Sequence, residues 1–231
     1  PGSTVVLPTA FILPDAPQRD IVVNLSERRL YYYHAENGQL SVFPVGIGRE
    51  GFTTPMMLTE TVTKIENPSW TPTASAHAEY AARGEFLPAV VPPGPDNPLG
   101  KYAIMLAARG YLLHGTNQSM GVGQPVSRGC IRLYAPHIEA LVKSVPNGTQ
   151  VRIIRQPHKV AWHQGALYLE SHADEQLGGD RDLTAAVAQI IKYTQKSDSY
   201  AAVAIDWQRV TETARNARGI PVRISKAASS G

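Results

Sequence analysis

Five prolines lie within the fourteen residues of LPAVVPPGPDNPLG, at positions 87–100. Proline has no backbone N–H and a fixed φ, so this stretch cannot form a regular helix or a central strand. A long irregular segment inside a compact domain is usually a lid or a binding wall, and the alternative is a rigid surface loop. The sequence therefore places its regular elements before and after this segment.

The regular elements up to residue 154 are predicted to be mostly strands. Apolar and polar residues alternate, and Thr, Val, Ile and aromatic residues are frequent, as in half-buried strands. This pattern covers residues 20–34, 38–48, 58–67, 101–116 and 147–154. Two helices are expected among them, a short one within 74–85 and an amphipathic one over 135–145. The predicted fold class is mainly β, a twisted pair of sheets with few helices.

The pattern changes after Pro157. We expect a hairpin over 160–171, helices over 183–196 and 206–219, and a short strand in PVRIS. The expected helix caps are Asp182 and Asp206 at the N-termini and Gly219 at a C-terminus. The chain is therefore divided into an extended N-terminal linker (1–18), a β-rich domain (19–156) and a small α+β subdomain (157–226).

Composition is that of a globular protein with a substantial core. Of 231 residues, 43% are hydrophobic and 18% charged, and the net charge is +3 with a pI of about 9.0. The cations do not cluster, so no nucleic-acid face is predicted, although a basic balance suits an anionic polymer. No stretch approaches about 18 apolar residues, so no transmembrane segment is expected. The chain does not begin with Met, so its sequence neither shows nor excludes an export signal.

Two other patterns indicate no cofactor. His158 and His163 in HKVAWH lack cysteines or acids at metal-ligand spacing, so no metal is expected. The GIGREG segment at 46–51 lacks the strand–helix context of a dinucleotide site. We expect a chain without metal or nucleotide.

The only cysteine, Cys130, follows His114 by sixteen residues across a glycine-rich loop. A thiol is only slightly ionised at pH 7, and a neighbouring imidazole can accept its proton and lower its pKa. Backbone amides at Gly129 and Cys130 can point at a developing oxyanion. Ser127 is suited to bracing the loop, and Arg132 to holding a carboxylate.

Each of these residues also has a structural interpretation. A lone cysteine is more often a small core residue, and a histidine at a strand end is often a satisfied surface or core side chain. Arg132 is equally suited to pairing with a structural acid, and Ser127 to capping a turn. Spacing alone therefore leaves nucleophilic catalysis as one of two interpretations.

The motif HGT followed by SRGCIRL resembles the signature of L,D-transpeptidases with a YkuD-type catalytic domain. The resemblance extends over residues 19–225, through VGIGREGFTTP and NPSWTPTASAHAEYAARGE to the C-terminal HKVAWHQGALYLE and GIPVRIS, and favours the periplasmic Gram-negative branch. It implies a YkuD-like twisted β-sandwich. It also implies attack on the bond between meso-diaminopimelate and D-alanine of a peptidoglycan tetrapeptide stem, through a cysteine thioester.

Carried over by position, the resemblance makes Cys130 the nucleophile and His114 its base. The Gly115 carbonyl orients the imidazole, the amides of Gly129 and Cys130 form the oxyanion hole, and Arg132 binds substrate. One residue departs from the family pattern, because Arg128 stands where a histidine usually precedes Gly-Cys. Arg128 either stabilises the thiolate or a substrate carboxylate, or faces solvent.

Three further residues are candidate contacts for the stem or glycan. Trp70, Tyr80 and Asn117 lie near the motif or in the segments expected to wall the cleft, with core packing as the alternative for the two aromatic residues. Walls formed by 74–85 and 87–99 would limit the water that competes for a thioester.

The leading hypothesis is an exported, periplasmic L,D-transpeptidase. Its acyl acceptor is either the lysine of an outer-membrane lipoprotein, towards which the resemblance leans, or the amine of a neighbouring stem, giving 3-3 cross-links. A hydrolase of the same linkage is a third outcome. The alternative from another class is a peptidoglycan-binding module without activity, which the intact Cys130 and His114 disfavour.

Overall fold

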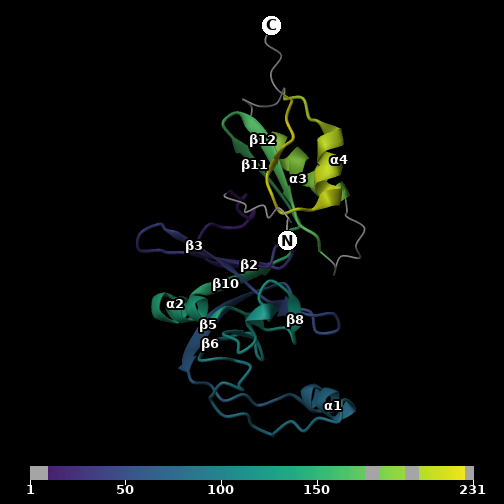
Figure 1. The fold of residues 1–231 in the computed structure, drawn as a ribbon. Helices are drawn as coiled ribbons and strands as arrows, with labels where there is room; N and C mark the ends of the chain where they lie inside the picture. The colour runs from purple at the N-terminus through teal and green to yellow at the C-terminus, as the bar shows by residue number, and fades with distance from the viewer. Residues whose placement is uncertain (1–9, 175–182, 196–202, 227–231) are drawn as a thin grey trace, which may run out of the picture. The chain divides into compact units, whose positions relative to one another are not determined.

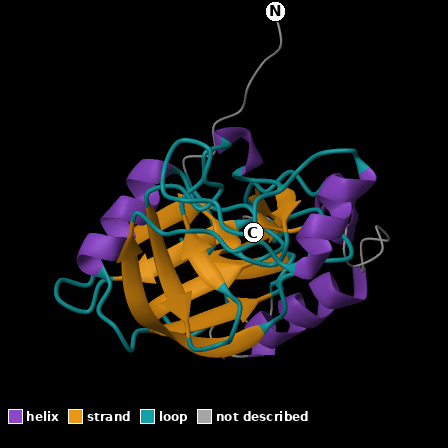
Figure 2. Ribbon diagram, turned by 90° about the horizontal axis from the view of Figure 1, so that it is seen from below, coloured by secondary structure: helices purple, strands orange, loops and turns teal. Residues whose placement is uncertain are grey.

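The computed structural model describes residues 10–174, 183–195 and 203–226, which fall into two compact units (Figure 1). The larger unit is Gln18–Ile154, and the smaller unit combines Pro1–Pro17 with Arg155–Gly231. Strands predominate in the regular structure, as Figure 2 shows, and the expected mainly β fold is confirmed.

A large sheet of eight strands forms the frame of the larger unit, in the order β3-β2-β1-β10-β5-β6-β7-β9. Its strands are β1 (Asp20–Asn24), β2 (Arg29–Tyr33), β3 (Leu40–Pro44), β5 (Met57–Glu66), β6 (Tyr102–Leu106), β7 (Leu112–His114), β9 (Ile131–Arg132) and β10 (Gln150–Ile154). Neighbours are antiparallel except for β1 with β10 and β7 with β9, which run parallel. Each strand-like segment of the sequence up to residue 154 therefore contributes to this sheet.

The other elements of the larger unit are short. Strands β4 (Ile47–Gly48) and β8 (Pro125–Ser127) pair in parallel, and a 3-10 turn, η1, spans Ser119–Gly121. Helices α1 (Ala74–Ala82) and α2 (Ala135–Ser144) confirm the two predicted helices. Proline in the first turn of α2 costs no hydrogen bond there, and α2 buries Ile138 and Leu141 in the core.

Alternation along β7 and β9 decides where the site can form. Leu113 and Ile131 point into the hydrophobic core and are almost completely buried. Their neighbours His114 and Arg132, which are paired across the two strands, therefore project from the opposite face of the sheet. Cys130 immediately precedes β9, two residues before Arg132, and its side chain lies with those of His114 and Arg132 around one cavity.

The proline-rich segment has no helix or strand, as its sequence predicts, apart from one bridge between Trp70 and Val91. Its backbone is organised by the fully buried side chain of Asn97. The amide nitrogen of Asn97 donates to carbonyls that include those of Pro68 (2.8 Å) and Val91 (3.2 Å), and its oxygen accepts from Leu99 N–H (2.9 Å). One buried amide thus replaces the hydrogen bonds that prolines cannot make.

The smaller unit contains a three-stranded sheet and two helices. Its elements are β11 (His158–His163), β12 (Ala166–Ser171), α3 (Leu183–Gln195), α4 (Trp207–Asn216) and β13 (Val222–Arg223). Val160, Leu167, Leu169, Ile190, Val210 and Ile224 form its core. Residues 10–17, interpreted above as linker, cluster with this unit, where Ile12 is buried and bonded to Lys159 and Glu170.

The expected helix caps have different outcomes. Asp206 accepts from Arg209 N–H and caps α4 as predicted. The predicted C-cap Gly219 is wrong, because α4 ends at Asn216 and Ala217 adopts the left-handed conformation instead. Asp182 lies outside the described residues.

Candidate active site

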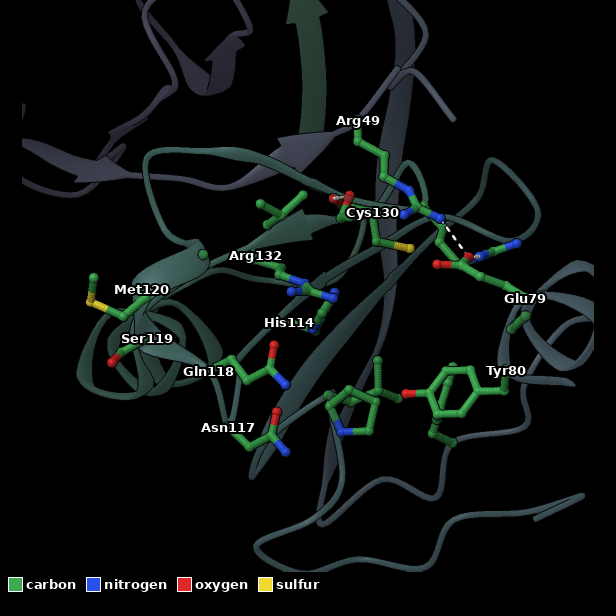
Figure 3. Close-up of a pocket in the computed structure, with 18 of the residues that line it drawn as sticks. Arg49, Glu79, Tyr80, His114, Asn117, Gln118, Ser119, Met120, Cys130 and Arg132 are labelled. Carbon is green, nitrogen blue, oxygen red and sulfur yellow. Dashed lines mark hydrogen bonds and ion pairs between the residues drawn. The ribbon is translucent and has the colours of Figure 1, made fainter. Parts of the chain in front are cut away.

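A cavity of about 840 Å³ opens on the polar face of β7 and β9 (Figure 3). The predicted site residues that line it are Trp70, Tyr80, His114, Asn117, Ser127, Arg128, Cys130 and Arg132. The remaining two, Gly115 and Gly129, each adjoin one of these side chains. The fold therefore gathers segments as distant in sequence as Trp70 and Arg132 around one space.

His114 is buried, and the backbone carbonyl of the next residue orients its ring. Its Nδ1 lies 2.6 Å from the carbonyl oxygen of Gly115. A carbonyl only accepts, so Nδ1 carries the hydrogen and Nε2 keeps its lone pair. Burial, and next the charge of Arg132, lower the pKa of His114 from 6.5 to about 4, although the Gly115 and Leu99 carbonyls act in the opposite direction. The ring is therefore a neutral acceptor at pH 7.

Cys130 is a neutral thiol in this structure. Burial raises its pKa, and a backbone hydrogen bond from Leu112 and the charge of Arg132 offset this only in part. Among the described residues, the thiol donates to the carbonyl of Gly110 at 3.6 Å rather than to His114. The sequence-based expectation of a thiol whose pKa is lowered by an ion pair with His114 is wrong here, because desolvation penalises both charged forms.

The backbone before Cys130 is fixed by two buried hydroxyls. Ser127 Oγ donates to the Cys130 carbonyl at 2.6 Å and accepts from Gly129 N–H at 3.1 Å. Thr54 Oγ1 donates to the Gly129 carbonyl at 2.9 Å. Gly129 has φ +108°, and a Cβ there would lie 3.2 Å from the ring of Tyr111, so only glycine fits. Ser127 therefore braces the loop.

This bracing changes the expected oxyanion hole. The Gly129 amide is already bonded to Ser127, so it does not point freely into the cavity as the sequence led us to expect. The Cys130 amide has no hydrogen-bond acceptor among the residues that the structure describes. Of the two predicted donors, Cys130 N–H is the one left for an oxyanion.

Arg132 lies beside His114 on the neighbouring strand. It has no ion-pair partner within the described part of the chain, and its buried Nε has no hydrogen-bond partner there. Burial lowers its pKa, while the nearby Cys130 and Tyr80 raise it. An unpaired, partly buried guanidinium next to the thiol is suited to a carboxylate of a ligand.

The Arg128 side chain neither contacts the thiol nor points freely into solvent, because it packs against two other residues. Its guanidinium bonds to Glu79 on α1 and stacks on the ring of Phe52, 4.0 Å from the centroid. The same Glu79 oxygen accepts from Arg49 Nη2 at 2.5 Å, and Figure 3 shows this contact. These hydrogen bonds, chiefly from Arg49, hold the pKa of Glu79 at about 2. Arg128 thus ties the nucleophile loop to α1.

The segments 74–85 and 87–99, which the sequence predicts as walls of the cleft, form one side of the cavity. Helix α1 contributes Glu79 and Tyr80, and the segment after it contributes Pro98 and Leu99. Figure 3 shows Tyr80 and Glu79 on one side of the cavity, and Asn117, Gln118, Ser119 and Met120 on the other. Only Ala76 of α1 is buried, and Figure 1 shows the helix standing away from the sheet.

Four residues that shape this site are not marked by any motif in the sequence. Glu79 bonds to Arg128 and to Arg49, Thr54 fixes Gly129, and Gly110 accepts from the thiol. Each acts across at least twenty residues of sequence, so no local pattern marks it. The one available signal was the unusual Arg128, because a partly buried arginine favours an acidic partner.

Comparison with known proteins gives a consistent family. The L,D-transpeptidase catalytic domain family, YkuD, matches residues 18–153. "Probable L,D-transpeptidase ErfK/SrfK" of Salmonella typhimurium is 42% identical over 231 residues, covering 97% of this chain and 73% of that protein. "Probable L,D-transpeptidase YcfS" of Escherichia coli is 50% identical over 176 residues, covering 74% and 55%. The chain belongs to the L,D-transpeptidases with a YkuD catalytic domain.

Among solved structures, the Ldtfm–avibactam carbamoyl enzyme has a TM-score of 0.47 and 19% identity, covering 60% of this chain and 49% of that one. In the described part of the present chain, every helix is too short or too polar to cross a lipid bilayer.

Proposed function

We propose that this protein is a periplasmic L,D-transpeptidase that acts on peptidoglycan tetrapeptide stems through a thioester on Cys130. The observation that carries the proposal is that Cys130, Arg132 and His114 project from one face of β7 and β9 into the same cavity. Family membership supports the reaction class.

In the first half of the reaction, Cys130 Sγ attacks the carbonyl carbon that diaminopimelate contributes to its bond with D-alanine. The thiol proton passes to His114 Nε2, and the oxyanion accepts from Cys130 N–H. Because both groups are neutral at rest, proton transfer accompanies attack rather than preceding it. The C–N bond then breaks, and His114 returns the proton to the departing D-alanine amine.

In the second half, an acceptor amine attacks the thioester and gives its proton to His114. The C–S bond breaks and the thiol is restored, so the acyl group moves without ATP. The proposed acceptors are a lipoprotein lysine or the amine of a neighbouring stem. If water is the acceptor, the protein is a hydrolase of the same linkage. Tyr80, Trp70 and Asn117 are proposed to contact the stem or glycan and to limit the access of water to the thioester.

Thiol acylation tests the chemistry. A carbapenem should add once to the wild-type protein, Cys130→Ala should show no mass shift, and His114→Ala should react far more slowly. If wild-type protein reacts with neither a carbapenem nor a small thiol reagent, it is a peptidoglycan-binding module instead.

Acceptor choice needs a separate measurement. Wall sacculi incubated with the protein and a lipoprotein, then digested to muropeptides, should yield either lipoprotein-linked or 3-3 cross-linked products. Release of D-alanine with neither product would identify the hydrolase.

A further inference from the structure

The charged residues around the cavity are strongly unbalanced. Four arginines line it, namely Arg49, Arg83, Arg128 and Arg132, against the single acid Glu79. His114 adds no positive charge at pH 7, since its pKa is about 4. A concave site with one sign of charge concentrates ligands of the opposite sign. The cavity therefore favours a ligand with more than one negative group. Arg132 can pair with only one of these groups.

Guanidinium N–H groups without a partner indicate a second place in the cavity where a negative group of a ligand can bind. Arg128 Nε and Nη2 and Arg49 Nε have no hydrogen-bond partner among the described residues. These nitrogens are covered by protein atoms, whereas the side chains that carry them are 23% exposed for Arg128 and 36% exposed for Arg49 and line the cavity. A ligand carboxylate that entered there would pair with donors whose lack of a partner is otherwise costly. Glu79 uses only Nη1 of Arg128 and Nη2 of Arg49.

The two guanidinium groups are held in place before any ligand arrives. Arg49 follows β4 and Arg128 follows β8, and these strands pair in parallel, with Arg49 N–H donating to the Ser127 carbonyl at 3.0 Å. Both guanidinium groups lie over the ring of Phe52, at 5.0 and 4.0 Å from its centroid. Such pre-organisation removes much of the ordering cost of binding.

We propose that Arg49 and Arg128 form a second carboxylate subsite, which binds the free side-chain carboxylate of the diaminopimelate residue that Cys130 attacks. Arg128 and Cys130 line the same cavity, so a stem residue held at the thiol lies in a space that Arg128 also borders. Glu79 balances one of the two charges and fixes their spacing. The inference rests on the proposed function and assigns the enzyme a preference for non-amidated stems.

The test compares two synthetic tetrapeptide stems that differ only at the diaminopimelate side chain, a free carboxylate in one and its carboxamide in the other. Binding is measured by calorimetry to protein carrying Cys130→Ala, so that no turnover occurs. The free acid should bind about tenfold or more tightly than the amide, the range of a charge-assisted hydrogen bond.

Adding Arg128→Gln or Arg49→Gln should weaken binding of the acid alone and remove most of the preference. Arg19→Gln, which removes an equal charge from an exposed side chain of the same unit, should leave the preference intact. Arg128→Lys keeps the charge without the fork and should retain an intermediate preference, and it replaces Arg128→Gln if that variant fails to show the wild-type unfolding curve.

Equal binding of the two peptides, or an equal loss for both in Arg128→Gln, would overturn the subsite. Failure of the proposed function has a different signature, because it appears as absent thioester formation by the wild-type protein with either peptide. A protein that forms the thioester equally well from both peptides retains its function and lacks the subsite.

Discussion

Arg128 and Arg132 flank the cysteine at the same distance in sequence, yet they belong to different walls of the cavity. Arg132 lies on β9 beside buried His114 and has no carboxylate partner within the described residues. Arg128 lies in the loop, bonded to Glu79 and stacked on Phe52. We call the side formed by β7 and β9, with His114 and Arg132, the strand wall, and the side formed by α1, with Glu79 and its partner Arg128, the α1 wall. The strand wall leaves the charge of Arg132 without a carboxylate partner, while on the α1 wall Glu79 balances part of the positive charge.

This difference separates two roles of arginine charge. On the strand wall, Arg132 lowers the pKa of both His114 and Cys130, so its charge acts on the reacting atoms. On the α1 wall, charge holds two segments together and leaves spare donors. The strand wall should therefore govern rate and pH dependence, and the α1 wall should govern substrate choice and local mobility.

The largest expected effect is on the strand wall. His114→Gln keeps a polar side chain of similar size but removes the base, and the rate of thiol acylation by a carbapenem should fall about 10²- to 10⁴-fold. Stopped-flow or mass-spectrometric time courses measure this rate. His34→Gln, which changes a histidine bonded to Ser41 in the same unit, should leave it unchanged. A comparable rate in both variants would remove His114 from the mechanism.

The two walls should also lose stability in different pH ranges. His114 is neutral in the folded protein down to about pH 4 but protonates near 6.5 when unfolded. Its contribution is therefore complete above pH 6.5 and is lost as the pH falls towards 4, on the order of 3 kcal/mol. Glu79, with a folded pKa of about 2 against 4.5, loses its contribution only below pH 4.5.

Denaturant unfolding at a series of pH values checks these ranges. The slope of unfolding free energy between pH 6.5 and about 5 should be smaller in His114→Gln than in wild type and unaltered in Glu79→Gln. An unchanged slope in His114→Gln would contradict the buried neutral ring.

A smaller effect distinguishes the flanking arginines. Arg132→Gln should lower the acylation rate about ten- to hundredfold, the range for loss of a charge-assisted contact. It should also move the pH profile of iodoacetamide modification upward, because the charge of Arg132 lowers the pKa of Cys130. Arg128→Gln should not move that profile, and an equal displacement in both variants would erase the distinction between the walls.

The smallest effect concerns the α1 wall alone. Glu79→Gln removes the acceptor shared by Arg49 and Arg128, so amide hydrogen exchange in residues 74–82 should accelerate while β7 and β9 remain protected. The unfolding midpoint should barely change, since ion pairs that keep contact with solvent contribute little. Glu85→Gln, which affects an exposed pair with Arg83, is the matched control. Unchanged exchange in α1 would show that packing, not Glu79, holds it.

The sequence predicted the parts of the site that depend on local chemistry and strand alternation. Cys130 and Arg132 are two residues apart and must share a face if that segment is extended. The position of His114 at a strand end, and of a glycine before the cysteine, could also be predicted from the sequence. The helix end at Ala217 was not, because a left-handed alanine succeeds only where the surrounding fold stabilises it.

The amino-acid sequence by itself determined the mainly β fold, the irregular proline-rich wall and the sixteen-residue spacing between one imidazole and one thiol, since these follow from backbone chemistry and residue order. Only the tertiary structure decided the charge states and the partners. Burial made both Cys130 and His114 neutral, Ser127 occupied the Gly129 amide, and Glu79 captured Arg128 from forty-nine residues away. Desolvation and long-range pairing depend on which side chains meet in space, and no local pattern encodes that.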